Sequence, residues 1–149
     1  MLSQGVSSIG SCMAFSATTP ASHDATGFAA LTYTQSAEAT QIGDVGPENE
    51  VITYNTVCNG VVNKRLGATN FGQQTLELAY DDVNGGQTIL DAASIAKNQV
   101  AVRETLSSGV VLYYIAYVSS FKTQVGGSSD FLRASVGLEL DGEIIKVAA

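Results

Sequence analysis

Tryptophan is absent from this chain of 149 residues, and histidine (one), cysteine (two) and proline (two) are almost absent. The single histidine, His23, lies in a polar turn beside Asp24, and we expect it to be a solvated loop residue. One histidine and two distant cysteines do not provide the ligand spacing of a zinc site. Cys12 and Cys58 are also too few and too far apart for a disulfide framework, so we expect two reduced, partly buried thiols. The sequence therefore predicts no metal and no cofactor.

Long apolar runs and basic residues are also scarce. Although 45% of the residues are hydrophobic, no run approaches the ~20 residues that cross a bilayer, which argues against a membrane protein. The first basic residue is Lys64, so the basic start of a secretory signal is missing and we expect synthesis in the cytoplasm. Lys64 and Arg65 are the only adjacent pair of basic residues. Because phosphate backbones are held by several clustered cations, the sequence argues against direct nucleic-acid recognition.

The density of charge is low as well. Charged residues make up 14% of the chain, against about 25% in average soluble domains, and the net charge is −7. Interface cores are depleted in charge, so extensive contact between subunits is one explanation and a weakly charged monomer is the other. The length suffices for one domain with a sizeable core, and no internal repeat or linker divides it. We therefore expect residues 1–149 to form a single domain.

Motifs of catalytic sites are missing or incomplete. Residues 94–97 match the Ser-x-x-Lys pattern of penicillin-binding enzymes, but the companion motifs of those enzymes are absent. Asp81 and Asp82 could form an acid pair or a metal site, although acidic residues at the start of a helix are explained by the helix dipole. No phosphate loop, dinucleotide fingerprint or nucleophile elbow occurs. The sequence therefore predicts a protein that is not an enzyme.

The pattern of the first half of the chain predicts short strands joined by turns. Asn59 and Gly60 separate two strand-like runs, and this dipeptide favours a tight hairpin because both residues accept positive φ. The expected elements are a strand at 8–17, a helical turn at 27–31, a strand at 38–45, a polar tip at 48–50, and strands at 51–56 and 61–66.

Alternation of apolar and polar residues is clearest in the second half. Residues 73–80 place Leu76 and Leu78 on one face, and Asp82 then follows as the expected cap of a helix. The expected elements are a strand at 73–80, a helix at 82–97 with Ile89, Leu90, Ala93 and Ala96 toward the core, strands at 99–106 and 110–120, a flexible loop at 123–130, and strands at 132–140 and 144–147. Together they predict a mainly β fold, an antiparallel β-sandwich with one flanking α-helix.

Several motifs in this order carry a resemblance. In chain order they are Gly43-Asp44-Val45-Gly46-Pro47-Glu48, Asn63-Lys64-Arg65-Leu66-Gly67, Gln74-Thr75-Leu76-Glu77-Leu78-Ala79-Tyr80 followed by Asp81-Asp82 and a helix, Ser119-Ser120-Phe121-Lys122-Thr123-Gln124-Val125-Gly126-Gly127, and Leu132-Arg133-Ala134-Ser135-Val136-Gly137-Leu138-Glu139-Leu140. This arrangement resembles the major tail tube protein of long-tailed bacteriophages with non-contractile tails. The resemblance covers roughly Thr34 to Ile145, and residues 1–33 form an N-terminal segment that is longer and richer in serine than the family leads us to expect.

The resemblance implies a structural role in a virion. Proteins of this family fold as a β-sandwich with a flanking helix, and six copies close into a ring whose inner strands form a continuous barrel. The rings stack into a tube that passes genomic DNA to the host cell. The expected partners are copies of the chain itself, a tape measure protein, a tail terminator and tail-tip proteins, while double-stranded DNA passes without specific binding. The expected location is the virion tail, assembled in the cytoplasm of the host bacterium.

The resemblance also suggests which residues line the tube and which make contacts between rings. Acidic side chains on polar strand faces are candidates for the lumen of the tube, although solvated strand faces would carry the same residues: Glu77, Glu139 and Asp141. The segments 44–55 and 123–130 are candidates for contacts between rings, with these residues: Asp44, Glu48, Glu50, Thr123, Gln124 and Asp130. The alternatives are the tube of a contractile tail or a secretion machine, and a secreted or surface β-sandwich that binds a ligand.

Overall fold

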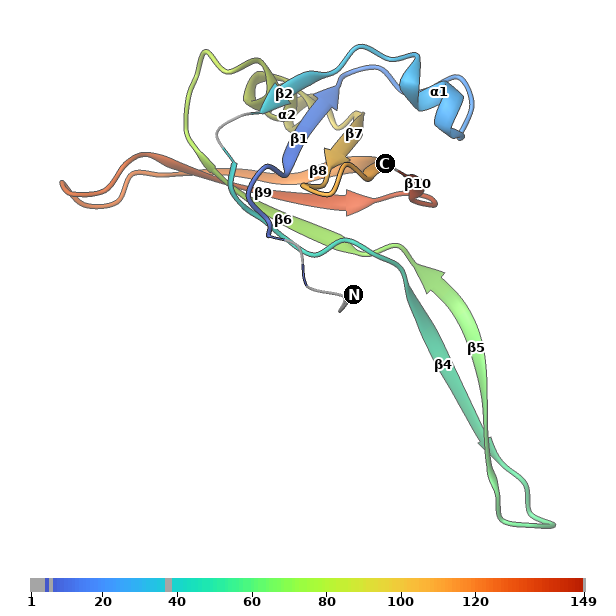
Figure 1. Cartoon of the computed structure of the whole chain (residues 1–149). Helices are drawn as coiled ribbons and strands as arrows, with labels where there is room; N and C mark the ends of the chain where they lie inside the picture. Colours follow the sequence, from blue (N-terminus) through green and yellow to red (C-terminus); the bar gives the residue numbers. More distant parts are fainter. Residues whose placement is uncertain (1–4, 6, 37–38, 149) are drawn as a thin grey trace.

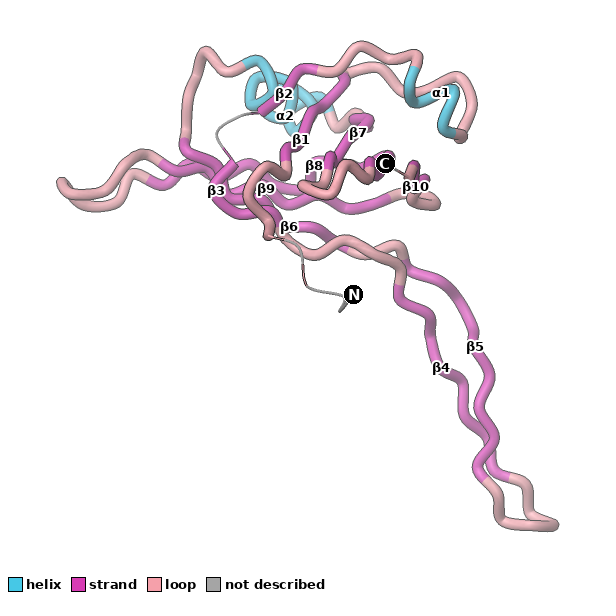
Figure 2. Tube along the Cα trace, in the orientation of Figure 1, coloured by secondary structure: helices cyan, strands magenta, loops and turns pink. Residues whose placement is uncertain are grey.

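The computed structural model describes residue 5, residues 7–36 and residues 39–148, and its described part holds ten strands and two helices (Figures 1 and 2). Their order is β1 (Cys12–Ser16), α1 (Ala25–Ala29), β2 (Thr34–Ser36), β3 (Ala39–Ile42), β4 (Glu48–Asn55), β5 (Val62–Asn70), β6 (Gln73–Ala79), α2 (Gly85–Ala96), β7 (Gln99–Thr105), β8 (Val111–Gln124), β9 (Arg133–Leu140) and β10 (Ile145–Val147). The predicted mainly β fold with a flanking helix is confirmed. None of the helices in the described residues combines the length and the apolar character needed to span a membrane.

Eight strands form one antiparallel sheet, in the order β2-β1-β7-β8-β9-β6-β3, with β10 paired to β8. The 14-residue strand β8 joins two layers, because residues 111–117 pair with β7 and residues 116–124 pair with β9. A register shift between Val118 and Ser120 interrupts the second pairing, and such bulges bend a strand. The sheet therefore folds over itself across β8, with β1, β2 and β7 above β6 and β9 (Figure 1).

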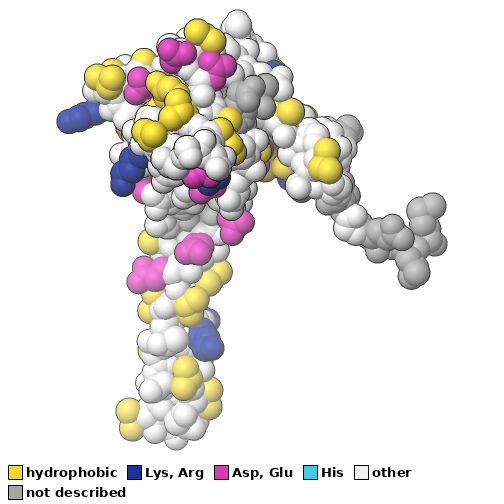
Figure 3. All heavy atoms as spheres, turned by 90° about the vertical axis from the view of Figure 1, so that its left-hand side faces the viewer, with side chains coloured by type: hydrophobic (Ala, Val, Ile, Leu, Met, Phe, Trp, Pro, Cys, Tyr) yellow, Lys and Arg dark blue, Asp and Glu magenta, His cyan; other side chains and the backbone are white. Residues whose placement is uncertain are grey.

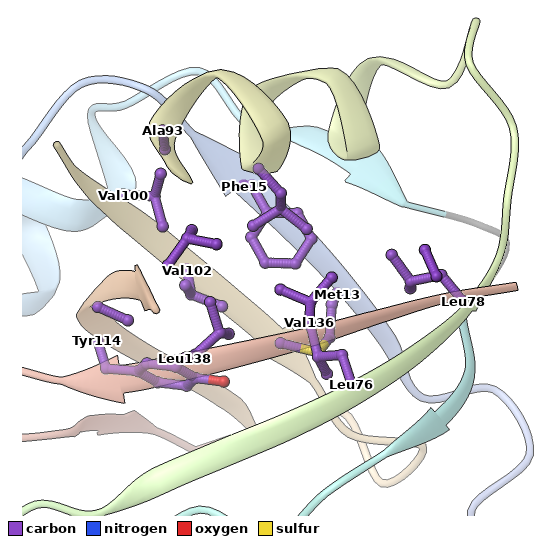
Figure 4. Packing of buried hydrophobic residues seen from close by; sticks show 14 residues of the cluster. Met13, Phe15, Leu76, Leu78, Ala93, Val100, Val102, Tyr114, Val136 and Leu138 are labelled. Carbon is purple, nitrogen blue, oxygen red and sulfur yellow. The ribbon is translucent and has the colours of Figure 1, made fainter. Parts of the chain in front are cut away.

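The core lies between these layers and beneath α2 (Figure 4). Strand β6 buries Leu76 and Leu78, and β9 buries Val136 and Leu138, as the alternation predicts. From above, the core receives these fully buried side chains: Met13 and Phe15 of β1, Val100 and Val102 of β7, and Leu90 of α2. Both layers thus bury their apolar residues against one another, which fixes the register of the strands that carry these residues.

Helix α2 begins later than predicted. Its N-cap is Asn84, whose Oδ1 accepts a hydrogen bond from the Gln87 amide at 3.2 Å, so the prediction of Asp82 as the cap is wrong. The reason is a turn before the helix, in which the Asp81 carboxylate accepts the Val83 amide at 3.1 Å. The expected core position Ala96 is also wrong, because this residue is exposed in the last turn.

Three further expectations need correction. Residues 48–50 are not a tip but the start of β4, and the loop expected from Thr123 starts after Gln124, which still pairs with Arg133. Cys58 is exposed, although Cys12 is half-buried and both thiols are free as expected. The strand expected from residue 38 is observed from Ala39 onward, and residue 38 itself lies outside the described residues.

His23 is exposed but does more than face solvent. Its Nε2 lies 2.7 Å from the carbonyl oxygen of Glu143, and its ring meets the edge of Phe28 with centroids 5.3 Å apart. Phe28 is fully buried and stacks on Tyr113 of β8 at 5.5 Å. The α1 segment is therefore tied to the C-terminal turn and to the outer side of β8.

Candidate assembly surfaces

The most prominent surface feature is an arm, formed by β4, β5 and the turn between them (Figure 1). All residues of β4 are exposed, and within the described part of the chain the two strands pack chiefly against each other. An isolated two-stranded hairpin is marginally stable in water. The arm therefore pairs its backbone groups only along the inner edges of its two strands, and its side chains lack a protein cover.

Apolar side chains occupy both faces of the arm. Directly paired residues share a face, so Val51 and Leu66 lie together on one face, and Ile52 and Tyr54 lie on the other. Their exposed fractions are 56% and 69% for the first pair, and 48% and 47% for the second. Because the two faces point in opposite directions, a single covering surface cannot bury both.

The turn of the arm lies where the sequence predicts it, but it is wider than the expected tight turn, because β4 ends at Asn55, β5 begins at Val62 and Asn59 does not have a positive φ. Gly60 has a φ of 64°, and the Asn59 side-chain oxygen accepts the Val61 amide at 3.1 Å. The same oxygen also binds the hydroxyl of Thr56. Val57 is fully exposed at this tip, which leaves an apolar residue at the far end of the arm.

A second projection, the loop at residues 125–132, lies at the opposite end of the molecule (Figure 1). The register of β6 with β9 runs from Gln73 opposite Glu139 to Ala79 opposite Arg133. The arm joins β6 at Gln73, and the loop joins β9 at Arg133. Exposed apolar side chains occur here too: Val125, Phe131 and Leu132. The chain thus carries apolar projections at both ends of one strand pair.

The lower layer also has two free strand edges. On the β7 side of β8 the pairing ends at Tyr117, so among the described strands residues 118–124 pair with β9 alone. Among the described strands, β3 pairs with β6 alone. Unpaired edges expose backbone donors and acceptors that invite further strands. The four strands β8, β9, β6 and β3 form a sheet that is open on both sides.

Two of the predicted lumen residues share one face of this sheet. Glu77 on β6 and Glu139 on β9 are exposed on the face opposite the core. Asp141 lies beyond the end of β9, where its Oδ2 accepts a hydrogen bond from Gln99 Nε2 at 2.7 Å. The sequence interpretation missed Lys122, which is aligned with Glu77 across Ser135 on the same face. Alternation along β8 could have revealed it only if the bulge had been known.

The predicted inter-ring residues separate into two groups. Asp44 and Glu48 lie at the base of the arm, where they line a polar hollow of about 500 Å³ together with Glu139. Glu50 lies further out on β4. Thr123, Gln124 and Asp130 belong to the opposite end of the molecule, where Asp130 Oδ2 accepts the Gly127 amide at 2.9 Å. Among the described residues, no group of three or more potential ligands is arranged to hold a metal ion.

A buried polar chain beneath the sheet was not predicted. The Tyr114 hydroxyl donates to Gln74 Oε1 at 2.6 Å, and Gln74 Nε2 donates to the Gly43 carbonyl at 3.1 Å. Glu104, which is 6% exposed, lies 3.3 Å from the same hydroxyl. Burial raises the pKa of the Glu104 carboxyl, although the contacts with Tyr114 and Gln74 act in the other direction. The Tyr114 hydroxyl has one proton, so its short contact with Gln74 Oε1 and its longer contact with Glu104 Oε2 compete for the same donor.

Known proteins share both the sequence pattern and the fold. A sequence profile of the family described as phage tail tube protein (TTP) matches residues 14–149. This range includes most of the N-terminal segment that the resemblance left out. A search of curated protein sequences gives no significant match.

Solved structures give the same result at the level of fold. A chain of the anti-feeding prophage (AFP) baseplate superposes with a TM-score of 0.74 at 12% identity, over 99% of this chain and 98% of that chain. The SPP1 tail tube gives 0.60 at 12% identity, over 93% and 77%. The tail of a gene transfer agent (GTA) particle gives 0.62 at 9% identity, over 78% and 87%. With a family profile that spans nearly the whole length and a fold shared with tail tubes, this chain belongs to the phage tail tube protein family.

Proposed function

We propose that this chain is the tube subunit of a bacteriophage tail, and that six copies close into a ring whose stacking makes a conduit for genomic DNA. The observation that carries the proposal is the open four-stranded sheet β8-β9-β6-β3, with a free edge on each side. The arm and the loop at residues 125–132, which lie at opposite ends of this sheet, support stacking.

Strand direction supports closure of the sheet between copies. Three antiparallel steps separate β8 from β3, so these two edge strands run in opposite directions. In a ring with rotational symmetry, β3 of one copy therefore meets residues 118–124 of the next copy as an antiparallel neighbour. The same pairing continues around the ring, and no exposed edge remains. The number six rests on the family resemblance and on the AFP baseplate, which is described as 6-fold symmetrised, and the GTA tail, which has C6 symmetry.

Closure would turn one face of the sheet toward the lumen. The other face packs on the core and α2, so the open face with Glu77, Glu139 and Lys122 becomes the wall. Asp141 sits at the margin of this wall. Acidic and basic groups on one face partly offset each other, so the wall offers no continuous cationic track for phosphate groups. DNA would accordingly pass without specific binding.

The arm and the loop at residues 125–132 would make the contacts between rings. A head-to-tail contact between two different ends does not close on itself, so repeated copies form a filament. The arm group of predicted residues then serves one ring junction (Asp44, Glu48 and Glu50), and the loop group serves the other (Thr123, Gln124 and Asp130). Both groups contact copies of the same chain.

The remaining partners follow from the proposed role. A tube needs a tape measure protein inside it during assembly, a terminator at one end and tail-tip proteins at the other. Chains of an AFP baseplate and of an AFP tube terminating cap share this fold, which supports partners at both tube ends. The role is structural rather than enzymatic, in a virion tail assembled in the cytoplasm of a host bacterium. The likeness to a chain of an extracellular contractile injection system also keeps the tube of a contractile machine as the second candidate.

Electron microscopy of the purified chain across a concentration series tests the proposal. Hollow tubes or stacked rings with six-fold end views are expected above a threshold concentration. Adding a preformed tail-tip complex as a seed should lower that threshold. Particles of monomer size at every concentration, with or without the seed, would contradict the proposal and favour a ligand-binding sandwich.

A further inference from the structure

The outer part of the arm, residues 51–66, differs in charge from the chain as a whole, because Lys64 and Arg65 are its only charged residues, whereas Glu48 and Glu50 lie nearer the base. The net charge is −7, yet the one adjacent basic pair, Lys64 and Arg65, lies on β5 within the arm. Both residues are exposed, and their cross-strand partners are Thr53 and Ile52, which carry no charge. The Arg65 guanidinium donates to the carbonyl of Lys64 at 3.4 Å, a contact that leaves its charge uncompensated. Because neighbouring residues of a strand face opposite ways, each face of the arm presents one cation among apolar side chains.

An acidic hollow lies at the other end of the molecule. It has a volume of about 150 Å³, and its lining includes three carboxylates: Asp81, Asp82 and Asp91. Tyr80 and Phe121 add aromatic surface to the same hollow. The Tyr80 amide donates to the Leu132 carbonyl at 2.9 Å, which places the hollow beside the loop at residues 125–132. We call this surface, defined by the five residues just named, the acidic end.

The arm and the acidic end complement each other in charge and in apolar content. Figure 3 shows basic and apolar side chains on the outer part of the arm, and acidic side chains both on the body above it and near the base of the arm. The arm cannot fold back on its own acidic end, since the two lie at opposite ends of the β6–β9 pair. Strand β4 has eight residues and β6 has seven, so at ~3.4 Å per residue the arm is about as long as the body strand beneath it. An arm of this length reaches the near end of a copy stacked head to tail.

We infer that the arm of one copy docks on the acidic end of a copy in the neighbouring ring, with Lys64 and Arg65 set against Asp82 and Asp91. This inference rests on the proposed stacking of rings and names the surface that receives each arm. Asp81 has a smaller part, because its carboxylate already accepts the Val83 amide. The acidic hollow at the base of the arm, with Glu48 and Glu139, is a less suitable receiver. It lies at the end from which the arm itself departs, and head-to-tail stacking points it away from the arriving arm.

Charge reversal with rescue tests the inference. The double variant Lys64→Glu/Arg65→Glu should raise the threshold concentration for tube assembly at least tenfold, and Asp82→Lys/Asp91→Lys should do the same. The quadruple variant, which restores opposite charges, should return to within about threefold of the wild-type threshold. Mixing the two double variants should also restore assembly. The acidic arm of the first variant can dock on the lysines of the second, and the basic arm of the second can dock on the acidic end of the first. Mixing further excludes misfolding as the cause of each single defect.

The matched control changes the charge by the same amount at the base of the arm. Combining Lys64→Glu/Arg65→Glu with Glu48→Lys/Glu139→Lys should leave assembly impaired. Rescue by this control in place of Asp82→Lys/Asp91→Lys would overturn the inference and make the neighbouring copy in the same ring the receiver. The inference would also be overturned if every variant that carries Lys64→Glu/Arg65→Glu formed tubes at the wild-type threshold concentration. A wild-type chain that forms no tubes even with a tail-tip seed would instead refute the proposed function, which the wild-type control reports separately.

Discussion

Truncating Leu66 to alanine isolates what the arm contributes to assembly. Its side chain is 69% exposed in the single chain, on the face of the arm that it shares with Val51. Burying a whole leucine side chain stabilises a protein by about 2 kcal/mol. Burial of the 69% of the Leu66 side chain that is still exposed would therefore stabilise the docked arm by about 1.4 kcal/mol. That amount corresponds to roughly a tenfold change in an equilibrium constant. Leu66→Ala should therefore raise the threshold concentration for tube formation about tenfold.

Sedimentation of tubes at a series of protein concentrations measures the threshold directly. The folded monomer should be nearly unaffected, because little of the Leu66 side chain is buried within it, and its Tm should stay within about 2 °C of the wild type. A threshold within twofold of the wild type for Leu66→Ala would refute the assignment of the arm as an assembly surface.

Three further predictions concern the folded chain. Glu104→Gln should unfold at a higher temperature than the wild type at pH 8, with the difference shrinking toward pH 4, because burial raises the pKa of Glu104 and the wild type loses stability as pH rises through that value. Asn84→Ala removes the cap of α2, which costs about 1 kcal/mol and should lower the Tm by roughly 2–4 °C. Gly43→Ala should cost about 1–3 kcal/mol, because its Cβ would lie 2.5 Å from the Thr75 carbonyl oxygen.

Each of these has a control in circular-dichroism melts of the monomer. A wild type that is more stable than Glu104→Gln at pH 8 would contradict the pKa direction. Asp82→Ala should leave the Tm within about 1 °C, and a loss equal to that of Asn84→Ala would contradict the cap assignment. Gly46→Ala, where no atom lies within 4 Å of the new Cβ, should be tolerated, and equal damage at both glycines would show that sterics at Gly43 are not the cause.

The core strands could be predicted because one face of each is buried. A period of two is imposed on β6 and β9 by the packing of Leu76, Leu78, Val136 and Leu138, and the sequence carries that period. The position of the turn near Asn59 and Gly60 was likewise predictable from backbone preference, although its form was not, because Gly60 alone of the two has a positive φ. In these features, the residue type is determined by the immediate surroundings of each residue.

The assembly surfaces are harder to predict for a physical reason. The arm is exposed on both faces in the single chain, so no burial pattern marks its length, and Glu48–Glu50 look like a tip although they begin β4. The exchange of partners along β8 depends on a bulge, which a single sequence does not reveal. Glu104 lies on the core side of β7 in phase with Val102, but a carboxyl at that position is understood only once Tyr114 is placed beside it.

A cryo-EM reconstruction of assembled tubes, at a resolution that traces backbone, would test ring closure most directly. The expected result is an antiparallel ladder between β3 of one subunit and residues 118–124 of the next, giving a barrel with four strands from each copy. Tubes in which either edge stays unpaired, or in which β2 or β10 joins the neighbouring subunit instead, would contradict the proposed ring.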